Sequence, residues 1–210
     1  MASELSFHYF IRRDRSGRVR WMLEELELPF DARRLDYEAG EASSPEYLRL
    51  HPLGRVPAVT MDVGTIHESG AICLYLADRY APGRLAPLID DPSRALYLQW
   101  MFYGPATIDP AISGVWDSDE VPEPQRVERR KTAVDWFKRV AKVVADSVEH
   151  NPYVTGNTFT AADVVIGLPL YWARRSNLLS SLPHVLGYLD RITARTAAVR
   201  SGVFADEGTQ

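Results

Sequence analysis

Residues 56–72 read VPAVTMDVGTIHESGAI, and this stretch decides the fold of the first part of the chain. Two short runs rich in β-branched residues, 56–61 and 64–67, flank Asp62-Val63-Gly64, which has the composition of a tight turn. From Ser69 the apolar residues follow helical spacing until Pro82-Gly83 ends the pattern. The stretch therefore predicts a β-hairpin followed by a helix.

The residues before this hairpin predict two further strands and two further helices. Residues 5–10 are short and rich in aromatics, and apolar residues at helical spacing follow from Val19 to Leu28. Residues 30–37 can form a second strand, and Ser44-Pro45 opens a short helix. The predicted order of the N-terminal part is βαβαββα.

A segment rich in proline separates this part from the rest of the chain. Residues 81–92 hold three prolines and one glycine. Every strong pattern beyond them is helical, over about 93–115, 123–149, 160–177 and 183–197. We therefore expect an α+β chain with an N-terminal domain over 1–81, a linker over 82–92 and an all-helical domain over 93–210.

Composition and charge disfavour several classes of protein. Apolar residues make up 46% of the chain and charged residues 25%, the balance of a globular protein. The net charge of −4 does not favour nucleic acid or an anionic membrane, and no stretch approaches ~18 uninterrupted apolar residues. The N-terminus lacks the layout of a signal peptide, and the only cysteine, Cys73, fits a reducing compartment. We expect a cytoplasmic protein with no nucleic-acid or membrane partner.

The histidines and the cysteine carry no signal of metal or redox chemistry. The five histidines show no spacing typical of ligands, so no metal site is expected. Cys73 lies on the apolar side of the helix predicted after the hairpin, which predicts a buried thiol. A cysteine-dependent reductase is thereby disfavoured.

Three motifs together resemble one known family. Residues 51–59 (HPLGRVPAV) and 67–72 (HESGAI) look like the glutathione-binding half of the glutathione S-transferases, and residues 154–163 (VTGNTFTAAD) resemble the helix-capping motif of their second domain. Residues 18–26 are similar to the first helix of many bacterial and fungal members. The resemblance implies a thioredoxin-like N-terminal domain, an all-helical C-terminal domain and a homodimer.

The resemblance also assigns the residues that hold the peptide backbone of glutathione. It implies that Pro57 is cis, that Val56 offers its N–H and C=O to the cysteinyl residue, and that Arg55 reaches the glycyl carboxylate. Physical reasoning alone leaves a plain β-edge turn and a solvated arginine as alternatives.

Glu68 and Ser69 stand where the hairpin ends and the next helix begins. Ser69 is a natural N-cap, and the free N–H groups after it can bind a carboxylate. The resemblance implies that Ser69 takes the γ-glutamyl carboxylate and Glu68 the ammonium group. Thr160 and Asp163 form a capping box, for which we expect a structural role.

The loop before the first helix departs from the family's pattern. Glutathione chemistry needs the thiolate. By register against Arg18, the catalytic serine or cysteine of the family falls at Asp14, and a carboxylate touching a thiolate would cost up to about 4 kcal/mol at an effective dielectric of ~20. Three interpretations stay open: Asp14 caps the helix, Ser16 supplies the hydroxyl, or glutathione is bound without activation. We take Ser16 and Asp14 as the catalytic candidates and favour Ser16.

Aromatic residues at the start of the helical domain are candidates for a second-substrate pocket, among them Trp100, Tyr103 and Trp116. The resemblance implies a detoxifying enzyme that uses glutathione as co-substrate and conjugates it to a small apolar electrophile or reduces a hydroperoxide. The second hypothesis, favoured by Asp14, is a non-catalytic glutathione-transferase-like binding or regulatory protein.

Overall fold

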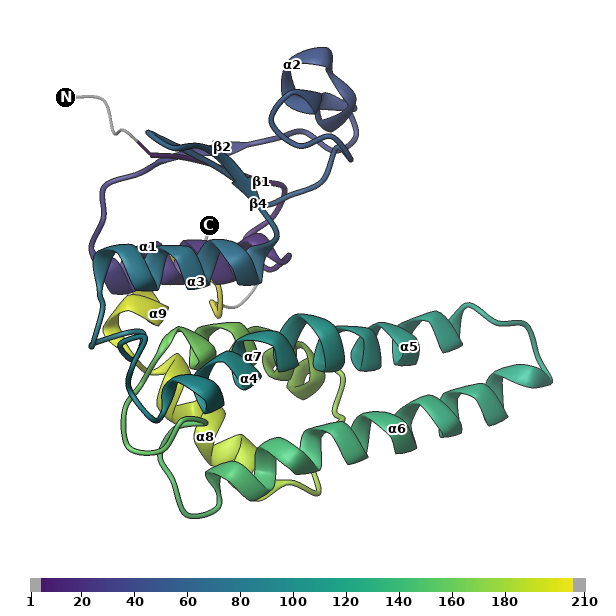
Figure 1. The fold of residues 1–210 in the computed structure, drawn as a ribbon. Coiled ribbons are helices and arrows are strands. Elements are labelled where there is room, and N and C mark those ends of the chain that lie inside the picture. Colours follow the sequence, from purple (N-terminus) through teal and green to yellow (C-terminus); the bar gives the residue numbers. More distant parts are fainter. Residues whose placement is uncertain (1–4, 206–210) are drawn as a thin grey trace. The chain divides into compact units, whose positions relative to one another are not determined.

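The computed structural model describes residues 5–205 of the chain. These residues form two compact units, shown in Figure 1. Of the described residues, 5–82 and 195–205 belong to the first unit and 83–194 to the second.

The first unit is built on a four-stranded sheet of order β2-β1-β3-β4. Its strands are β1 (Ser6–Tyr9), β2 (Asp31–Arg34), β3 (Ala58–Met61) and β4 (Gly64–His67). β1 and β2 are parallel, whereas β3 runs antiparallel to both β1 and β4. The predicted hairpin is confirmed, because β3 and β4 pair in register from Ala58–His67 to Met61–Gly64.

Two helices cover one face of this sheet. α1 (Ser16–Leu26) and α3 (Ser69–Tyr80) lie side by side there (Figure 1). The short helices η1 (Glu41–Ser43) and α2 (Pro45–Leu48) follow β2, and the hydroxyl of Ser44 accepts from the N–H of Tyr47 at 3.2 Å. The fully buried apolar side chains of α1 and α3 include Val19, Trp21, Met22, Leu23, Ile72 and Leu76. The predicted βαβαββα order and thioredoxin-like arrangement are confirmed.

The C-terminal helix α9 (Thr196–Ser201) packs against α1 within the first unit. The carboxylate of Glu25, 7% exposed, accepts from the Arg195 guanidinium at 2.7 and 2.8 Å and from the indole N–H of Trp21 at 3.0 Å. These bonds connect the segment that begins α9 to helix α1. The domain limits 1–81 and 93–210, as independently folding parts, stay a prediction.

The second unit is helical, as predicted. Its helices are α4 (Arg94–Tyr103), η2 (Gly104–Ile108), α5 (Asp109–Asp119), α6 (Gln125–Val148), α7 (Ala161–Arg175) and α8 (Pro183–Thr193). η2 is a π-helical segment between α4 and α5, in the region where the sequence predicted one uninterrupted helix. Gly104 permits close packing there, because an added Cβ would lie 2.7 Å from Val165 Cγ1. Among residues 5–205, no helix combines the length and hydropathy needed to cross a bilayer.

Asp163 organises the start of α7. The carboxylate is fully buried and accepts from the N–H of Thr160 at 2.8 Å, the N–H of Val154 at 3.0 Å and the hydroxyl of Tyr188 at 2.9 Å. Thr160 and Asp163 form the predicted capping box. Burial outweighs these donors and raises the pKa of Asp163 to about 6.

We predict that Asp163→Asn removes a component of the pH dependence of stability. Because the folded state holds this proton more tightly than the unfolded state, the contribution of Asp163 to the free energy of unfolding is full below pH ~4 and is lost as the pH rises to ~6. The neutral amide cannot titrate. Urea unfolding between pH 4 and 7 should show the wild type losing stability relative to the variant over this window.

Asp190→Asn is the matched control, because Asp190 lies on α8 near Tyr188 but is exposed and pairs with Arg174 at the surface. This control should retain the pH dependence of the wild type. Parallel pH profiles for wild type and Asp163→Asn would contradict the account.

Candidate functional site

The sheet register brings three loops to one edge. Ala58 at the start of β3 pairs with His67 at the end of β4 and with His8 near the end of β1. The segment before β3, the segment after β4 and the segment after β1 therefore emerge together. These segments carry Val56 and Pro57, Glu68 and Ser69, and the loop that holds Asp14.

The segment before β3 presents an unpaired peptide backbone. The Val56–Pro57 bond is cis, which confirms that expectation. In the part of the chain that the structure describes, no backbone hydrogen bond is formed by Val56. Its neighbour is fixed, since the carbonyl of Arg55 accepts from the hydroxyl of Tyr47 at 2.5 Å. Desolvation, with Asp14 adding to it, raises the pKa of that tyrosine and keeps it a donor. Val56 is thus held with both polar groups available for an extended peptide.

The segment after β4 has an unusual backbone. Ser69 was predicted to be the N-cap of α3, but it is the first helical residue and Glu68 is the N-cap. Glu68 adopts φ 71° and ψ 108°, a conformation that costs a non-glycine residue roughly 1–3 kcal/mol. The first intrahelical bond runs from the N–H of Ile72 to the carbonyl of Glu68, which leaves the N–H groups before it free for a ligand. Glu68 itself is exposed, and its side chain makes no capping hydrogen bond.

Ser69 is 5% exposed, and its hydroxyl oxygen accepts from Nη1 of Arg18 at 3.2 Å. Arg18 belongs to α1 and has no exposed surface. This contact joins α1 to the start of α3.

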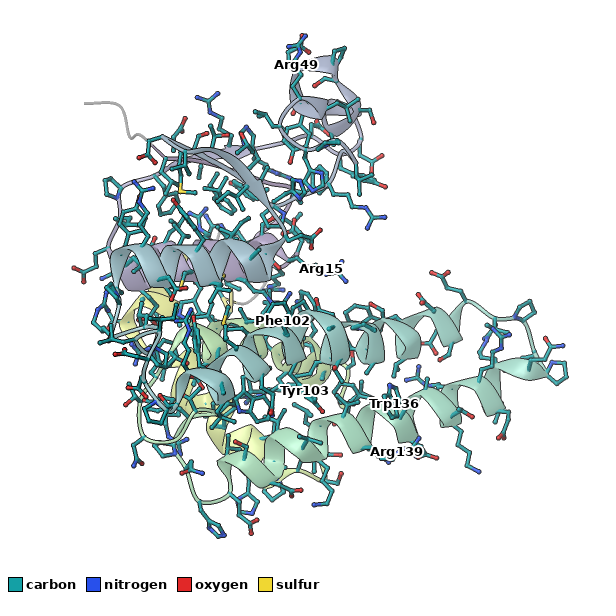
Figure 2. All side chains as sticks on the ribbon, in the orientation of Figure 1. Arg15, Arg49, Phe102, Tyr103, Trp136 and Arg139 are labelled. Atoms are coloured by element: carbon teal, nitrogen blue, oxygen red, sulfur yellow. The ribbon has the colours of Figure 1, made fainter. Side chains whose placement is uncertain are left out.

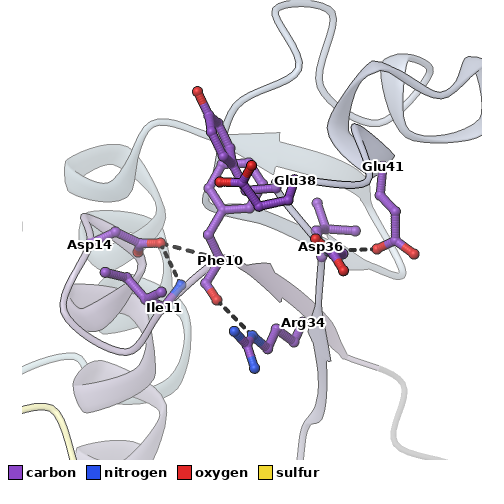
Figure 3. A pocket seen from close by; sticks show the side chains of 9 residues that line it. Phe10, Ile11, Asp14, Arg34, Asp36, Glu38 and Glu41 are labelled. Atoms are coloured by element: carbon purple, nitrogen blue, oxygen red, sulfur yellow. Dashed lines mark hydrogen bonds between the residues drawn. The ribbon is translucent and has the colours of Figure 1, made fainter. Parts of the chain in front are cut away.

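The loop before α1 is organised by Asp14. One carboxylate oxygen accepts from the N–H groups of Phe10 and Ile11 at 3.2 and 3.1 Å (Figure 3). The other oxygen accepts from the N–H of Ser16 at 2.6 Å. The carboxylate thus holds the loop and the helix start. Ser16 is 1% exposed, and its hydroxyl has no hydrogen-bond partner among residues 5–205.

A cavity of about 650 Å³ opens beside this loop (Figure 3). Its polar wall is acidic, because one arginine, Arg34, faces four carboxylates. The cavity is lined by Phe10, Ile11, Asp14, Arg34, Leu35, Asp36, Tyr37, Glu38 and Glu41. Local bonds use two more of the carboxylates besides Asp14, since Glu41 accepts from the N–H of Asp36 at 2.7 Å and Asp36 accepts from the N–H of Ala39 at 3.0 Å.

A histidine pair that no sequence pattern indicated lies at the same edge. The rings of His51 and His67 pack against each other with their centroids 4.7 Å apart and their planes tilted by 35°. Burial, followed by the charge of His67, lowers the pKa of His51, so its neutral ring accepts from the N–H of Leu53 at 3.3 Å. Among the described residues, no group of three or more His, Cys, Asp or Glu side chains is arranged to hold a metal ion. Burial raises the pKa of Cys73 to about 12, which makes this thiol unreactive.

The three aromatic candidates of the second unit have different surroundings. Trp100 is 3% exposed and packs on Tyr103, whose hydroxyl donates to the carbonyl of Val140. Trp116 is 40% exposed and contacts Trp172. None of these three residues lines the cavity of about 430 Å³ between α5 and α6. The residues that line it include Trp136, which Figure 2 shows on α6.

The chain is similar in sequence to proteins of one known family. The family model described as the glutathione S-transferase N-terminal domain matches residues 5–78. Glutathione S-transferase 3 of Schizosaccharomyces pombe is 30% identical over 189 residues, which cover 84% of this chain and 77% of that protein. Disulfide-bond oxidoreductase YfcG of Escherichia coli is 27% identical over 96% of both chains.

A similar fold is found in the crystal structure of a glutathione transferase from Phanerochaete chrysosporium in complex with oxidized glutathione. The TM-score is 0.84 at 23% identity, over 95% of this chain and 94% of that one. With the family model and the relative in Schizosaccharomyces pombe, the conclusion is direct: the chain belongs to the glutathione S-transferase family.

Proposed function

We propose that the chain is a glutathione transferase that binds glutathione at the edge formed by Val56, Glu68 and Ser69. The observation that carries the proposal is the backbone of Glu68. A non-glycine residue retains φ 71° and ψ 108° only where its surroundings enforce it, and such residues cluster at functional sites. Here the conformation sets an exposed carboxylate beside the free N–H groups of a helix start.

Each part of glutathione has a complementary group at this edge. The N–H groups at the start of α3 and the Ser69 hydroxyl suit the γ-glutamyl carboxylate, and the Glu68 carboxylate suits the neighbouring ammonium. The unpaired N–H and C=O of Val56 suit the cysteinyl backbone. The exposed guanidinium of Arg55 is the group that we assign to the glycyl carboxylate.

In the proposed reaction the glutathione thiol gives its proton to water, and the sulfur then forms a bond to an electrophilic carbon as the bond from that carbon to its leaving group breaks and the leaving group departs as an anion. With a hydroperoxide, the sulfur instead takes the outer oxygen as the O–O bond breaks and the alkoxide leaves with a proton from water as an alcohol. A second glutathione then displaces water from the sulfenic acid to give the disulfide. The positive end of α1 favours the thiolate. Since the charge of Asp14 is balanced by three backbone N–H donors, this carboxylate opposes the thiolate less than a bare anion would. We propose that the Ser16 hydroxyl is the hydrogen-bond donor to the sulfur, and we expect a small apolar electrophile or a hydroperoxide as co-substrate. Cytoplasmic location and a homodimer are part of this proposal.

A specific observation favours a second function. The Ser16 hydroxyl is buried, so a bound thiol reaches it only if the loop moves. If the loop does not move, the same edge serves a non-catalytic glutathione-binding protein. Retention on glutathione-agarose tests the binding that both functions share, and conjugation of glutathione to an activated aryl halide separates the enzyme from the binder.

Glu68→Ala and Ser69→Ala should each weaken glutathione binding by about tenfold or more, because each removes a charge-assisted partner of the γ-glutamyl end. Calorimetry measures the dissociation constants. Glu27→Ala is the control, since it removes an exposed carboxylate at the opposite end of α1. Wild-type affinity in both site variants would place glutathione elsewhere.

Glu68→Gly should separate stability from function. Glycine lacks the Cβ that disfavours a positive φ, so we expect the free energy of unfolding to be retained or raised, by up to about 1 kcal/mol, while glutathione affinity falls. Glu27 also has a positive φ, of 55°, and Glu27→Gly should stabilise the protein without changing the affinity. Loss of stability in Glu68→Gly would show that its conformation is not strained.

Ser16→Ala should raise the pKa of the bound glutathione thiol, read from the ultraviolet absorbance of the thiolate, and should leave affinity at low pH nearly unchanged. The reason is that a hydroxyl donor stabilises only the anion. An unchanged thiol pKa would remove Ser16 from the mechanism. A wild type that shows bound glutathione but no thiolate at neutral pH would favour the non-catalytic function.

A further inference from the structure

Arg18 is a charged side chain with no exposed surface, placed behind the edge that carries Glu68 and Ser69. Arginine is rarely this buried, because removing its charge from water costs several kcal/mol. Its Nη1 donates to the Ser69 hydroxyl oxygen across 51 positions of sequence. The charge of Arg18 also acts on the thiol of Cys73, which follows Ser69 by one helical turn. The guanidinium therefore lies against the first turn of α3.

This contact fixes the direction of the Ser69 hydroxyl. A hydroxyl has one proton and two lone pairs, and an arginine can only donate. Ser69 must therefore accept from Arg18, and its own proton stays available to a further acceptor. In the described part of the chain, no acceptor takes that proton. The hydroxyl and the N–H groups of the helix start are thus all donors, as an anion requires.

We propose that Arg18 is a positioning residue of the glutathione site: by donating to Ser69 it holds the serine hydroxyl as a donor, and it makes the site select ligands whose γ-glutamyl residue carries a free carboxylate. This inference rests on the proposed function. Donation from a cation polarises the hydroxyl and strengthens the bond that the hydroxyl gives to a carboxylate. Burial keeps the positive charge from being screened by salt. A neutral amide in place of the carboxylate gains little from either effect.

A double-mutant cycle tests the coupling. Calorimetry at pH 7 is performed on wild type, Arg18→Met, Ser69→Ala and the double variant, with two ligands: glutathione and its analogue in which the γ-glutamyl carboxylate is a primary amide. We expect Arg18→Met to lower the affinity for glutathione about tenfold or more when Ser69 is present, and less than about threefold in the Ser69→Ala background. Affinity for the amide should change less than about threefold throughout.

Two further variants control for structure. Arg20→Met removes a half-buried arginine of the same helix, whose Nε donates to the carbonyl of Ser201, and it should leave the affinity for glutathione unchanged. Arg18→Lys retains a cationic donor and should recover part of the affinity and of the preference for the carboxylate. If Arg18→Met does not fold, the cycle is repeated with Arg18→Gln, which keeps a donor but lacks the charge.

The outcomes separate the two claims. A wild type that does not bind glutathione overturns the proposed function and this inference with it. Two results with a wild type that binds glutathione would overturn only the inference. In the first, the Arg18 variants lower the affinities for glutathione and for the amide equally. In the second, they lower the affinity for glutathione by the same factor with and without Ser69, because Arg18 would then act through packing alone. Equal affinity of the wild type for glutathione and for its amide analogue would also overturn only the inference.

Discussion

The register of β3 between β1 and β4 is the constraint on which the candidate site depends. Ala58 pairs with His8 on one side and with His67 on the other, so three loops emerge at one edge. A slip of one residue would turn Val59, which is fully buried, to the other face and move the segment before β3 away from Glu68 and Ser69. Burial of this central strand thus fixes the place of groups that are distant in sequence.

The edge is electrostatically divided. The start of α3, with Arg18 behind it, presents donors and positive charge, whereas the cavity beside Asp14 is lined by four carboxylates and one arginine. An anionic peptide is therefore favoured at the former and disfavoured at the latter. Asp14, which the family resemblance places where a catalytic hydroxyl is expected, instead accepts hydrogen bonds from three backbone N–H groups of the loop.

Local signals predicted much of the fold. The hairpin, its turn and the capping box of Thr160 and Asp163 depend on neighbours in sequence, and the structure confirms them. Ser69 was predicted as an N-cap because serine at a helix start usually has that role, and the prediction was wrong by one position. Here Glu68 takes that place with an uncommon φ that no local pattern indicates.

Contacts between distant residues could not be predicted in the same way. Arg18 and Ser69, His51 and His67, and Glu25 and Arg195 are brought together only by packing. Arg18 illustrates the difficulty, because it is one of five arginines between residues 12 and 20 and nothing in the sequence distinguishes it from the others, yet it has no exposed surface. The π-helical segment η2 was not predicted for a related reason: the close packing of Gly104 against Val165, a residue distant in sequence, has no local signal.

The most direct test of the central claim is a crystal structure of the chain soaked with glutathione. The account predicts the γ-glutamyl carboxylate within hydrogen-bond distance of the Ser69 hydroxyl and of the N–H groups at the start of α3, with the cysteinyl backbone paired to Val56. Glutathione bound in the acidic cavity lined by Phe10 and Tyr37, or turned so that its glycyl carboxylate lies at Ser69, would contradict it.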